Sequence, residues 1–359
     1  MMPWAHGHQI KAIATFVAAI IAKQTGCQAE LARTQGNQEA ATKRLSRLIH
    51  NARLSPKDFA EWLCCRALEQ APRTGQVRVT IDWTSEDKQH LLVISLVVGR
   101  RALPIFWCAY DQTVLKGRMK RYERAVLKRA FKLIFEYVEP RRLKLTADRG
   151  FPDDDLFELL DQLGVFFILR VKGSVKVKVD NQWRKLNSLH LAGNARRRNL
   201  GRLAYCESKP HQVWGTMSRA RNKHGHWEIW YLVSNRPMHA KRMATEYGYR
   251  FCCEEGFRDA KWDLGFAQAR VKAVTAWSRL FAHFAIALFA LTSLGMRLLI
   301  RGRATARSLL RRVVSRRSDR CELSLIAASI ALVQQGWTLL DSLSPHTKLN
   351  LEATLSNVS

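Results

Sequence analysis

Apolar and polar residues alternate along residues 77–84, where every second residue from Val77 to Trp83 is apolar. This period of two predicts a β-strand with one buried face, and it puts Asp82 on the other face. Two further apolar runs, 90–98 and 101–110, meet around Gly99. We expect them to form an antiparallel meander with the first strand.

Helical and strand patterns take turns in the next part of the chain. They predict a helix at 119–138, a strand at 141–148, a helix at 152–164 and a strand at 165–172. Three strands followed by helix, strand, helix and strand is the order of an α/β, ribonuclease H-like fold. In that fold the first strand lies beside the end of the fourth, so we expect Asp82 and Asp148 to face each other.

The regions outside this core have different patterns. We divide the chain into five regions: a helical N-terminal DNA-binding region (1–73), a first part of the core (74–171), a β-rich insertion (172–239), a second part of the core with a signature helix (240–300) and a basic helical C-terminal region (301–359). For the N-terminal helices, DNA binding and a plain helical cap both stay open. The nine arginines of 297–320 either contact DNA or form a solvated flank, and residues 321–342 predict a helix that is a candidate for dimerisation.

Charge narrows the class of partner. The chain has 59 Lys and Arg against 30 Asp and Glu, a formal charge of +29, which favours a polyanion such as nucleic acid. The positive charge is spread over several segments, which disfavours a membrane-bound protein. The apolar residues 280–296 predict a core helix, and the cysteines contain no Cys-x-x-Cys pair, so a reducing, cytoplasmic location is expected.

Residues 247–261, YGYRFCCEEGFRDAK, carry four functional residue types at fixed spacing. On an α-helix Tyr247, Arg250, Glu254 and Lys261 fall within an arc of about 60°. An ordinary solvated face with an Arg250 to Glu254 ion pair is the alternative. Glu254 together with Asp82 and Asp148 gives three carboxylates, the donor set for two divalent cations in phosphodiester cleavage.

The spacing Tyr-x2-Arg-x3-Glu-x6-Lys resembles the signature of the cut-and-paste DDE transposases of bacterial insertion sequences. The segments TIDWTS and LTADRGFPDDDLFELLDQLGVFFILRVKG resemble those holding the first two acids of that family. The resemblance runs from about residue 30 to 295. It implies that Asp82, Asp148 and Glu254 bind two Mg²⁺ or Mn²⁺ ions, and that Tyr247, Arg250 and Lys261 hold phosphates of DNA.

The resemblance also assigns candidates around this set. Arg149 is expected to contact DNA, and Trp230 is the candidate for stacking on a flipped base. Hairpin formers have a glutamate where this chain has Gly150, which weakens that route. The expected partners are double-stranded transposon ends, target DNA and a second copy of the chain in a synaptic complex. A catalytically inactive DNA-binding relative and another ribonuclease H-like nuclease are the alternatives.

Overall fold

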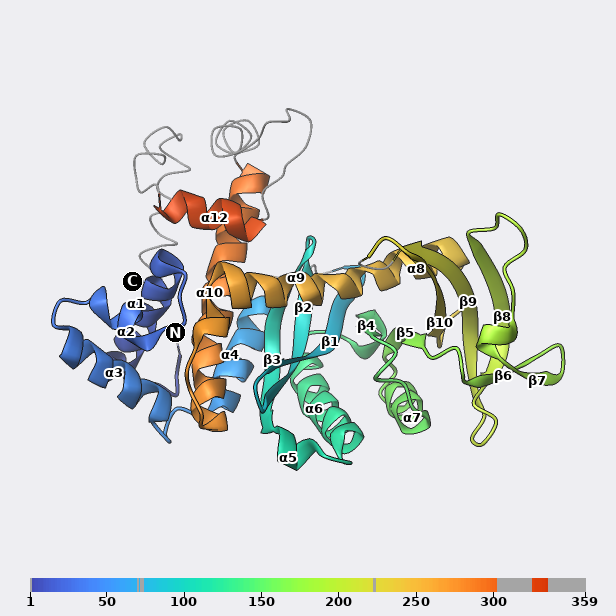
Figure 1. Cartoon of the computed structure of the whole chain (residues 1–359), viewed down its shortest axis with the longest axis horizontal. Helices are drawn as coiled ribbons and strands as arrows, with labels where there is room; N and C mark the ends of the chain where they lie inside the picture. The colour runs from blue at the N-terminus through green and yellow to red at the C-terminus, as the bar shows by residue number, and fades with distance from the viewer. Residues whose placement is uncertain (1, 70, 72–73, 222–223, 302–324, 335–359) are drawn as a thin grey trace.

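The computed structural model describes residues 2–69, 71, 74–221, 224–301 and 325–334 (Figure 1). Most of the predicted C-terminal region 301–359, including arginine-rich residues 302–320, lies outside this description. So does most of the helix expected at 321–342, of which the structure describes α12 (Leu325–Gln334).

A single sheet of ten strands, in the order β3-β2-β1-β4-β5-β10-β9-β8-β6-β7, organises the described chain. The strands β1, β2 and β3 are antiparallel neighbours, while β4 runs parallel to both β1 and β5. The predicted meander and the placement of the first strand beside the fourth are therefore observed. The strands are β1 (Val77–Glu86), β2 (Gln89–Val98), β3 (Arg101–Asp111), β4 (Leu143–Ala147), β5 (Phe166–Val171), β6 (Lys176–Val179), β7 (Gln182–Lys185), β8 (Arg197–Tyr205), β9 (His211–Arg221) and β10 (Trp227–Ser234).

Helices flank this sheet, which makes the structure mixed α/β (Figure 1). The helix α6 contacts β2 and β3, α7 contacts β5, α8 contacts β5, β8, β9 and β10, and α9 contacts β1 and β3. The helices are α1 (Gly7–Lys23), α2 (Gln28–Arg33), α3 (Gln38–His50), α4 (Pro56–Leu68), α5 (Gln112–Leu115), α6 (Met119–Ile134), α7 (Asp154–Gln162), α8 (Ala240–Gly248), α9 (Cys252–Arg258), α10 (Val274–Arg301) and α12.

The residues predicted as a β-rich insertion extend the core sheet. Strand β10 pairs antiparallel with β5 from Tyr231–Val171 to Ser234–Ile168, and β9, β8, β6 and β7 follow outward. The backbone pairing of β5 with β10 therefore joins the insertion directly to the part of the sheet that carries β1 and β4.

The N-terminal helices form as their sequence predicts. Ser55 caps α4 by accepting a hydrogen bond from Lys57 N, and Pro56 occupies the first helical position. In α1, Ile13, Phe16 and Ile20 are buried, so this apolar helix belongs to the core. Residues 274–296 of α10 are long and apolar enough to cross a membrane, and 78% of that apolar window is buried in the protein. This burial agrees with the predicted core helix.

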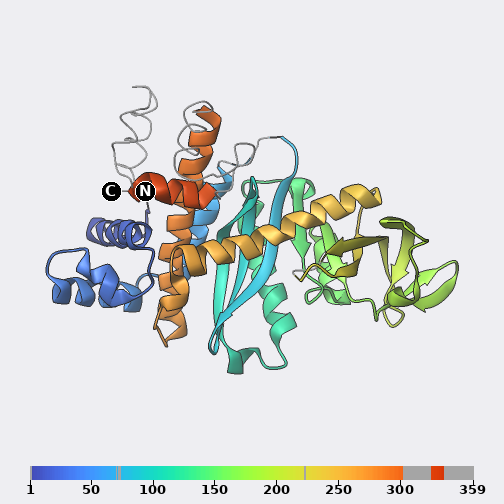
Figure 2. The same ribbon diagram turned by 45° about the horizontal axis from the view of Figure 1, so that its top comes forward.

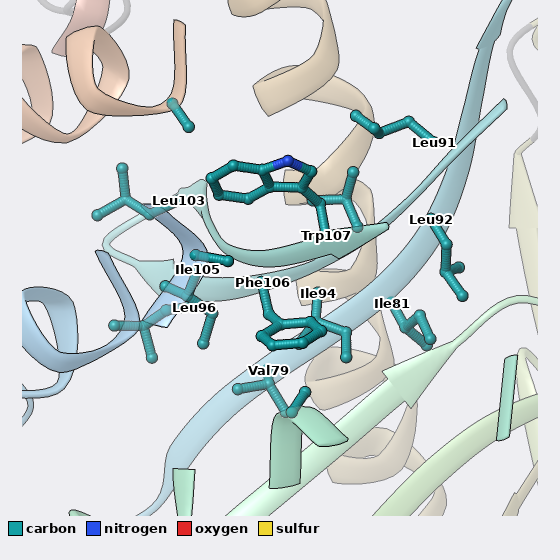
Figure 3. Packing of buried hydrophobic residues seen from close by; sticks show 14 of the residues in the cluster. Val79, Ile81, Leu91, Leu92, Ile94, Leu96, Leu103, Ile105, Phe106 and Trp107 are labelled. Carbon is teal, nitrogen blue, oxygen red and sulfur yellow. The ribbon is translucent and has the colours of Figure 1, made fainter. Parts of the chain in front are cut away.

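The alternation in β1 separates two environments. Val79 and Ile81 lie in the core cluster that Figure 3 shows beside β2 and β3. Thr80 and Asp82 point to the opposite face, where Thr80 meets the Cys253 thiol at 3.4 Å. Because side chains alternate along a strand, Asp82 faces α9 while its neighbour Trp83 faces α6.

The signature segment runs as a continuous coiled ribbon in Figure 2, but it is not one regular α-helix. A 3₁₀ turn at Tyr249–Phe251 separates α8 from α9, and a π-helical turn at Asp259–Asp263 follows. A Cβ on Gly256 would come within 2.7 Å of the Ala102 carbonyl oxygen, so this glycine lets α9 approach β3. The single stripe expected for a uniform helix is therefore interrupted before Lys261.

Candidate active site

Asp82 and Asp148 stand where two central strands part. The parallel pairing of β1 with β4 ends at Ile81–Ala147, and each aspartate is the next residue of its chain segment. Because each follows one member of this registered pair on neighbouring parallel strands, the backbones of the two aspartates lie side by side. The pairing of strands that are far apart in sequence thus brings these two acids together, as the sequence predicts.

Arg250 joins the third carboxylate to the first. Its Nη1 donates to Asp82 Oδ2 at 2.9 Å, and its Nη2 donates to Glu254 Oε1. The Arg250 side chain is 6% exposed, whereas that of Glu254 is 56% exposed. The ion pair between Arg250 and Glu254 is therefore present, but it belongs to a cluster with Asp82 and is not an ordinary solvated pair.

Tyr247 reaches the second aspartate from α8. Its hydroxyl donates to Asp148 Oδ1 at 3.3 Å, and the side chain is fully buried. Burial, above all, raises the pKa of the Tyr247 phenol. Tyr247 is therefore a neutral donor at this site. Tyr247, Arg250 and Glu254, the first three signature residues, therefore all lie where β1 and β4 part.

Lys261 has a different position from the other three. Its Nζ donates to the Ser85 carbonyl oxygen at 2.7 Å and lies 3.7 Å from Glu86 Oε2. Both partners are at the end of β1. Lys261 therefore ties the π-helical turn to the strand that carries Asp82, and it stays beside the carboxylates without contacting them.

The negative charges of the carboxylate cluster are only partly compensated. Burial raises the pKa of Asp82 to about 6, an effect that Asp148 and Glu254 strengthen and that Arg250 and the Trp83 amide oppose. The Trp83 N–H donates to Asp82 Oδ1 at 2.9 Å. One guanidinium shared between two acids, with a third acid alongside, leaves an excess of negative charge that a cation would relieve.

The donor chemistry of this cluster suits a hard divalent cation. Three carboxylates supply oxygen ligands of the kind that Mg²⁺ and Mn²⁺ prefer. As the side chains lie, however, no three His, Cys, Asp or Glu residues of the described chain form a group able to hold a metal ion. Arg250 occupies one oxygen of Asp82 and one of Glu254.

A cationic cavity of about 400 Å³ lies beside Asp148. Arg149, Arg170, Lys172 and Tyr231 are among its lining residues. Arg149 is exposed, and Arg170 is held by Glu228 at 3.0 Å. Three cations, Arg149, Arg170 and Lys172, therefore line a cavity next to the segment that carries Asp148.

The candidate stacking residue Trp230 is engaged within the protein. Its ring lies 5.4 Å from that of Phe251 in a stacked arrangement and 5.3 Å from that of Tyr247. Its Nε1 donates to Glu228 Oε1 at 2.6 Å. Trp227, three residues earlier on β10, is 60% exposed, with the Arg221 guanidinium 5.0 Å from its ring centre.

Residues 113–291, just under half of the chain, match the family model of the transposase DDE domain. The match supports a DDE transposase. No curated protein matches the chain. The segment similar to the transposase domain contains Asp148, Tyr247, Arg250, Glu254 and Lys261, and it begins after Asp82.

Sequence reasoning missed a buried glutamate behind the first two acids of this transposase-like site. Glu123 of α6 is 4% exposed and contacts Trp83 and Lys120. A signal was present, because Glu123 lies three residues before Val126 and seven before Ala130, on the apolar stripe of α6. A charged residue on such a stripe needs a buried partner.

Proposed function

We propose that this chain is a cut-and-paste DDE transposase with a ribonuclease H-like core. The observation that carries the proposal is the bond from Arg250 to Asp82, 168 residues away in the sequence, which unites Asp82 and Glu254 beside Asp148. The parallel β1 and β4 flanked by the antiparallel β2 and β3 agree with such a core. The transposase DDE match supports the same class.

Asp82, Asp148 and Glu254 would hold Mg²⁺ or Mn²⁺. Two such ions supply activation of the attacking water or hydroxyl and stabilisation of the leaving oxygen in phosphodiester cleavage. The protein's own part is to position these carboxylates within β1, directly after β4 and on α9. Water attack at the transposon end frees a 3′-hydroxyl, which then attacks the opposite strand or the target DNA.

Cations around the carboxylates would bind the DNA backbone. Arg250, once its carboxylate partners turn to the metal ions, has a guanidinium free to bind a phosphate in two places. Arg149 lies exposed at the cationic cavity, and Lys261 lies on the other side at the end of β1. Tyr247 keeps Asp148 oriented through its hydroxyl. These positions support the proposed contacts with a transposon end.

The base-stacking role would fall to a tryptophan of β10. Trp230 must leave its contacts with Phe251 and Tyr247 to receive a base on that side, whereas Trp227 already has an exposed ring. We therefore propose Trp227 beside Trp230 as a stacking residue. Substitution of each by Ala, followed by measurement of hairpin formation on a labelled end, separates the two.

A DNA-binding relative without cleavage activity is the second candidate. It is favoured by the contacts of Arg250, which already engages two of the three acids. In such a protein Arg250 would lock the cluster permanently. DNA binding would then persist in chelator and no strand would be cut.

Cleavage of an end-labelled duplex carrying a candidate transposon end distinguishes these functions. We expect cutting with Mg²⁺ or Mn²⁺, none with chelator, and none with D82A, D148A or E254A. Asp161 of α7, which accepts from Asn235 and pairs with His211, provides a matched carboxylate outside the cluster, so D161A should cut normally. Metal-independent cutting, or cutting by the three cluster variants, would contradict the proposal. Junction and RNA-DNA hybrid substrates test for another nuclease.

A further inference from the structure

Strand pairing brings Asp82 and Asp148 together, but neither acid is itself part of the β1–β4 ladder. The β1–β4 ladder stops at Ile81–Ala147, one residue before the two acids. Past that point β1 remains paired with β2, whereas the other segment turns away, with Phe151 N donating to the Asp148 carbonyl at 3.0 Å. Contacts outside the β1–β4 pairing therefore help to fix the distance between the two carboxylates.

Helix α6 makes that connection from the opposite face of the sheet. Trp83, which follows Asp82, points toward α6, and its Nε1 donates to Glu123 Oε1 at 2.9 Å. Trp83 also donates its backbone N–H to Asp82 Oδ1. The position of Trp83 therefore sets both the course of β1 after Asp82 and the orientation of one carboxylate oxygen of Asp82.

The other carboxylate oxygen of Glu123 is connected to the turn that follows Asp148. Glu123 Oε2 accepts from Lys120 Nζ at 3.0 Å. The same ammonium donates to the carbonyl oxygens of Gly150 and of Phe151, the latter at 2.7 Å, and these residues form the turn after Asp148. Glu123 is thus the centre of a bridge from the Asp82 strand to the Asp148 turn.

The chemistry of Glu123 argues for a role beyond packing. A carboxylate that is 4% exposed loses its hydration, and an apolar side chain of similar size would pack at the same place without that cost. Its neighbours on the buried stripe of α6, Val126, Leu127 and Ala130, are apolar. A buried group with both oxygens bonded to different segments restrains those segments more narrowly than apolar packing does.

We propose that Glu123 is a positioning residue which, through Trp83 and Lys120, holds Asp82 and Asp148 at the spacing their divalent cation needs. The inference rests on the proposed function, because it assumes that these acids bind the cation. Supporting residues around metal ligands typically contribute a factor of about 10–100 in metal affinity. The bridge should therefore be visible in cation binding itself, without any DNA.

The test is Mn²⁺ affinity of the full chain, measured by calorimetric titration without DNA. We expect E123Q and W83F to weaken binding at least about tenfold. W83F keeps an aromatic ring and the Glu123–Lys120 pair, so it gives an answer even if E123Q folds poorly. In the E123Q background W83F should have little further effect, since both changes break one bridge.

The matched control is R124Q, at the next residue of the same helix. Arg124 pairs with Asp153 and Asp155 and makes no contact with Trp83 or with the Asp148 turn. R124Q should keep Mn²⁺ affinity within about twofold. A structural role alone would lower the stability of E123Q and leave its affinity unchanged, as urea unfolding of the same samples would reveal.

Hydrogen exchange provides a second readout that involves no cation. E123Q should speed exchange at the amides of Trp83 and Phe151 together, and R124Q at neither. Wild-type affinity and wild-type exchange in both E123Q and W83F would overturn the bridge. If D82A binds Mn²⁺ as tightly as the wild type, the proposed function fails instead, because Asp82 then is no ligand.

Discussion

Two charge clusters contacted by the same helical stretch have opposite character. At the end of α8, Glu246 accepts from Arg78 at 2.8 and 2.9 Å and from Lys144 at 2.9 Å, so two cations share one acid. One turn further along, Arg250 alone is shared by Asp82 and Glu254. The first cluster has more cations than acids, and the second has more acids than cations.

The ionisation of the two clusters follows this difference. Although burial alone would raise the pKa of Glu246, hydrogen bonds from Arg78 and Lys144 lower it to about 2. Burial raises the pKa of Asp82 to about 6, and a single guanidinium does not reverse this. An acid kept charged at a cost to the fold is expected where a cation binds.

The largest effect should come from breaking the cluster around Glu246. E246Q leaves the Lys144 ammonium, 1% exposed, without a counter-charge, and should lower the free energy of unfolding by about 3–5 kcal/mol at pH 7. The stabilisation from Glu246 is present above pH 4.5 and is lost as pH falls toward 2. Urea unfolding at pH 7 and pH 3 measures both effects.

The control for this change is the exposed helix pair of Glu39 and Lys43, with side chains 78% and 63% exposed. E39Q should change stability by about 0.5 kcal/mol or less. A loss as small in E246Q would show that the two clusters do not differ in the way described.

The acid-rich cluster should respond with the opposite sign. Without metal, D82N should raise the free energy of unfolding at pH 7 by about 1–3 kcal/mol, because each unit of pKa shift corresponds to about 1.4 kcal/mol. The Asn oxygen can still accept from Arg250. Ionised Asp82 destabilises the fold above its pKa of about 6, so the gain should disappear below about pH 4. Destabilisation by D82N at pH 7 would remove the contrast between the clusters.

The smallest effect concerns Lys261, at the edge of the acid-rich cluster. K261M loses one hydrogen bond to the Ser85 carbonyl and should cost about 0.5–1.5 kcal/mol. If Lys261 also contacts a phosphate, the slope of log affinity for DNA against log salt should fall by about 1. An unchanged slope would restrict Lys261 to its structural contact with β1.

Local patterns were sufficient for the strand order and the position of Asp82. Alternation in β1 specifies which face each side chain takes, and the order of strands and helices placed β1 beside β4. The signature spacing identified Tyr247, Arg250 and Glu254 as neighbours of one site. The family match supports the transposase class, while the roles of the individual residues stay predictions.

The contacts that set the charge balance were beyond local patterns. Spacing on a helix predicted Arg250 next to Glu254, but its bond to Asp82 depends on how α9 crosses β1. The π-helical turn that moves Lys261 toward Ser85 leaves no period in the sequence. Glu246 and Glu123 each take partners from two other elements, and only the assembled sheet brings those partners together.

The most direct test is thermal or urea unfolding of the wild type and D82N, each with and without Mn²⁺ and without DNA. The account predicts that the ranking reverses. D82N is the more stable without metal, whereas the wild type gains about 4.1 kcal/mol at a Mn²⁺ concentration of 1,000 times Kd and becomes the more stable. An unchanged ranking, with no stabilisation of the wild type by Mn²⁺, would contradict the claim that this acid-rich cluster is a cation-binding active site.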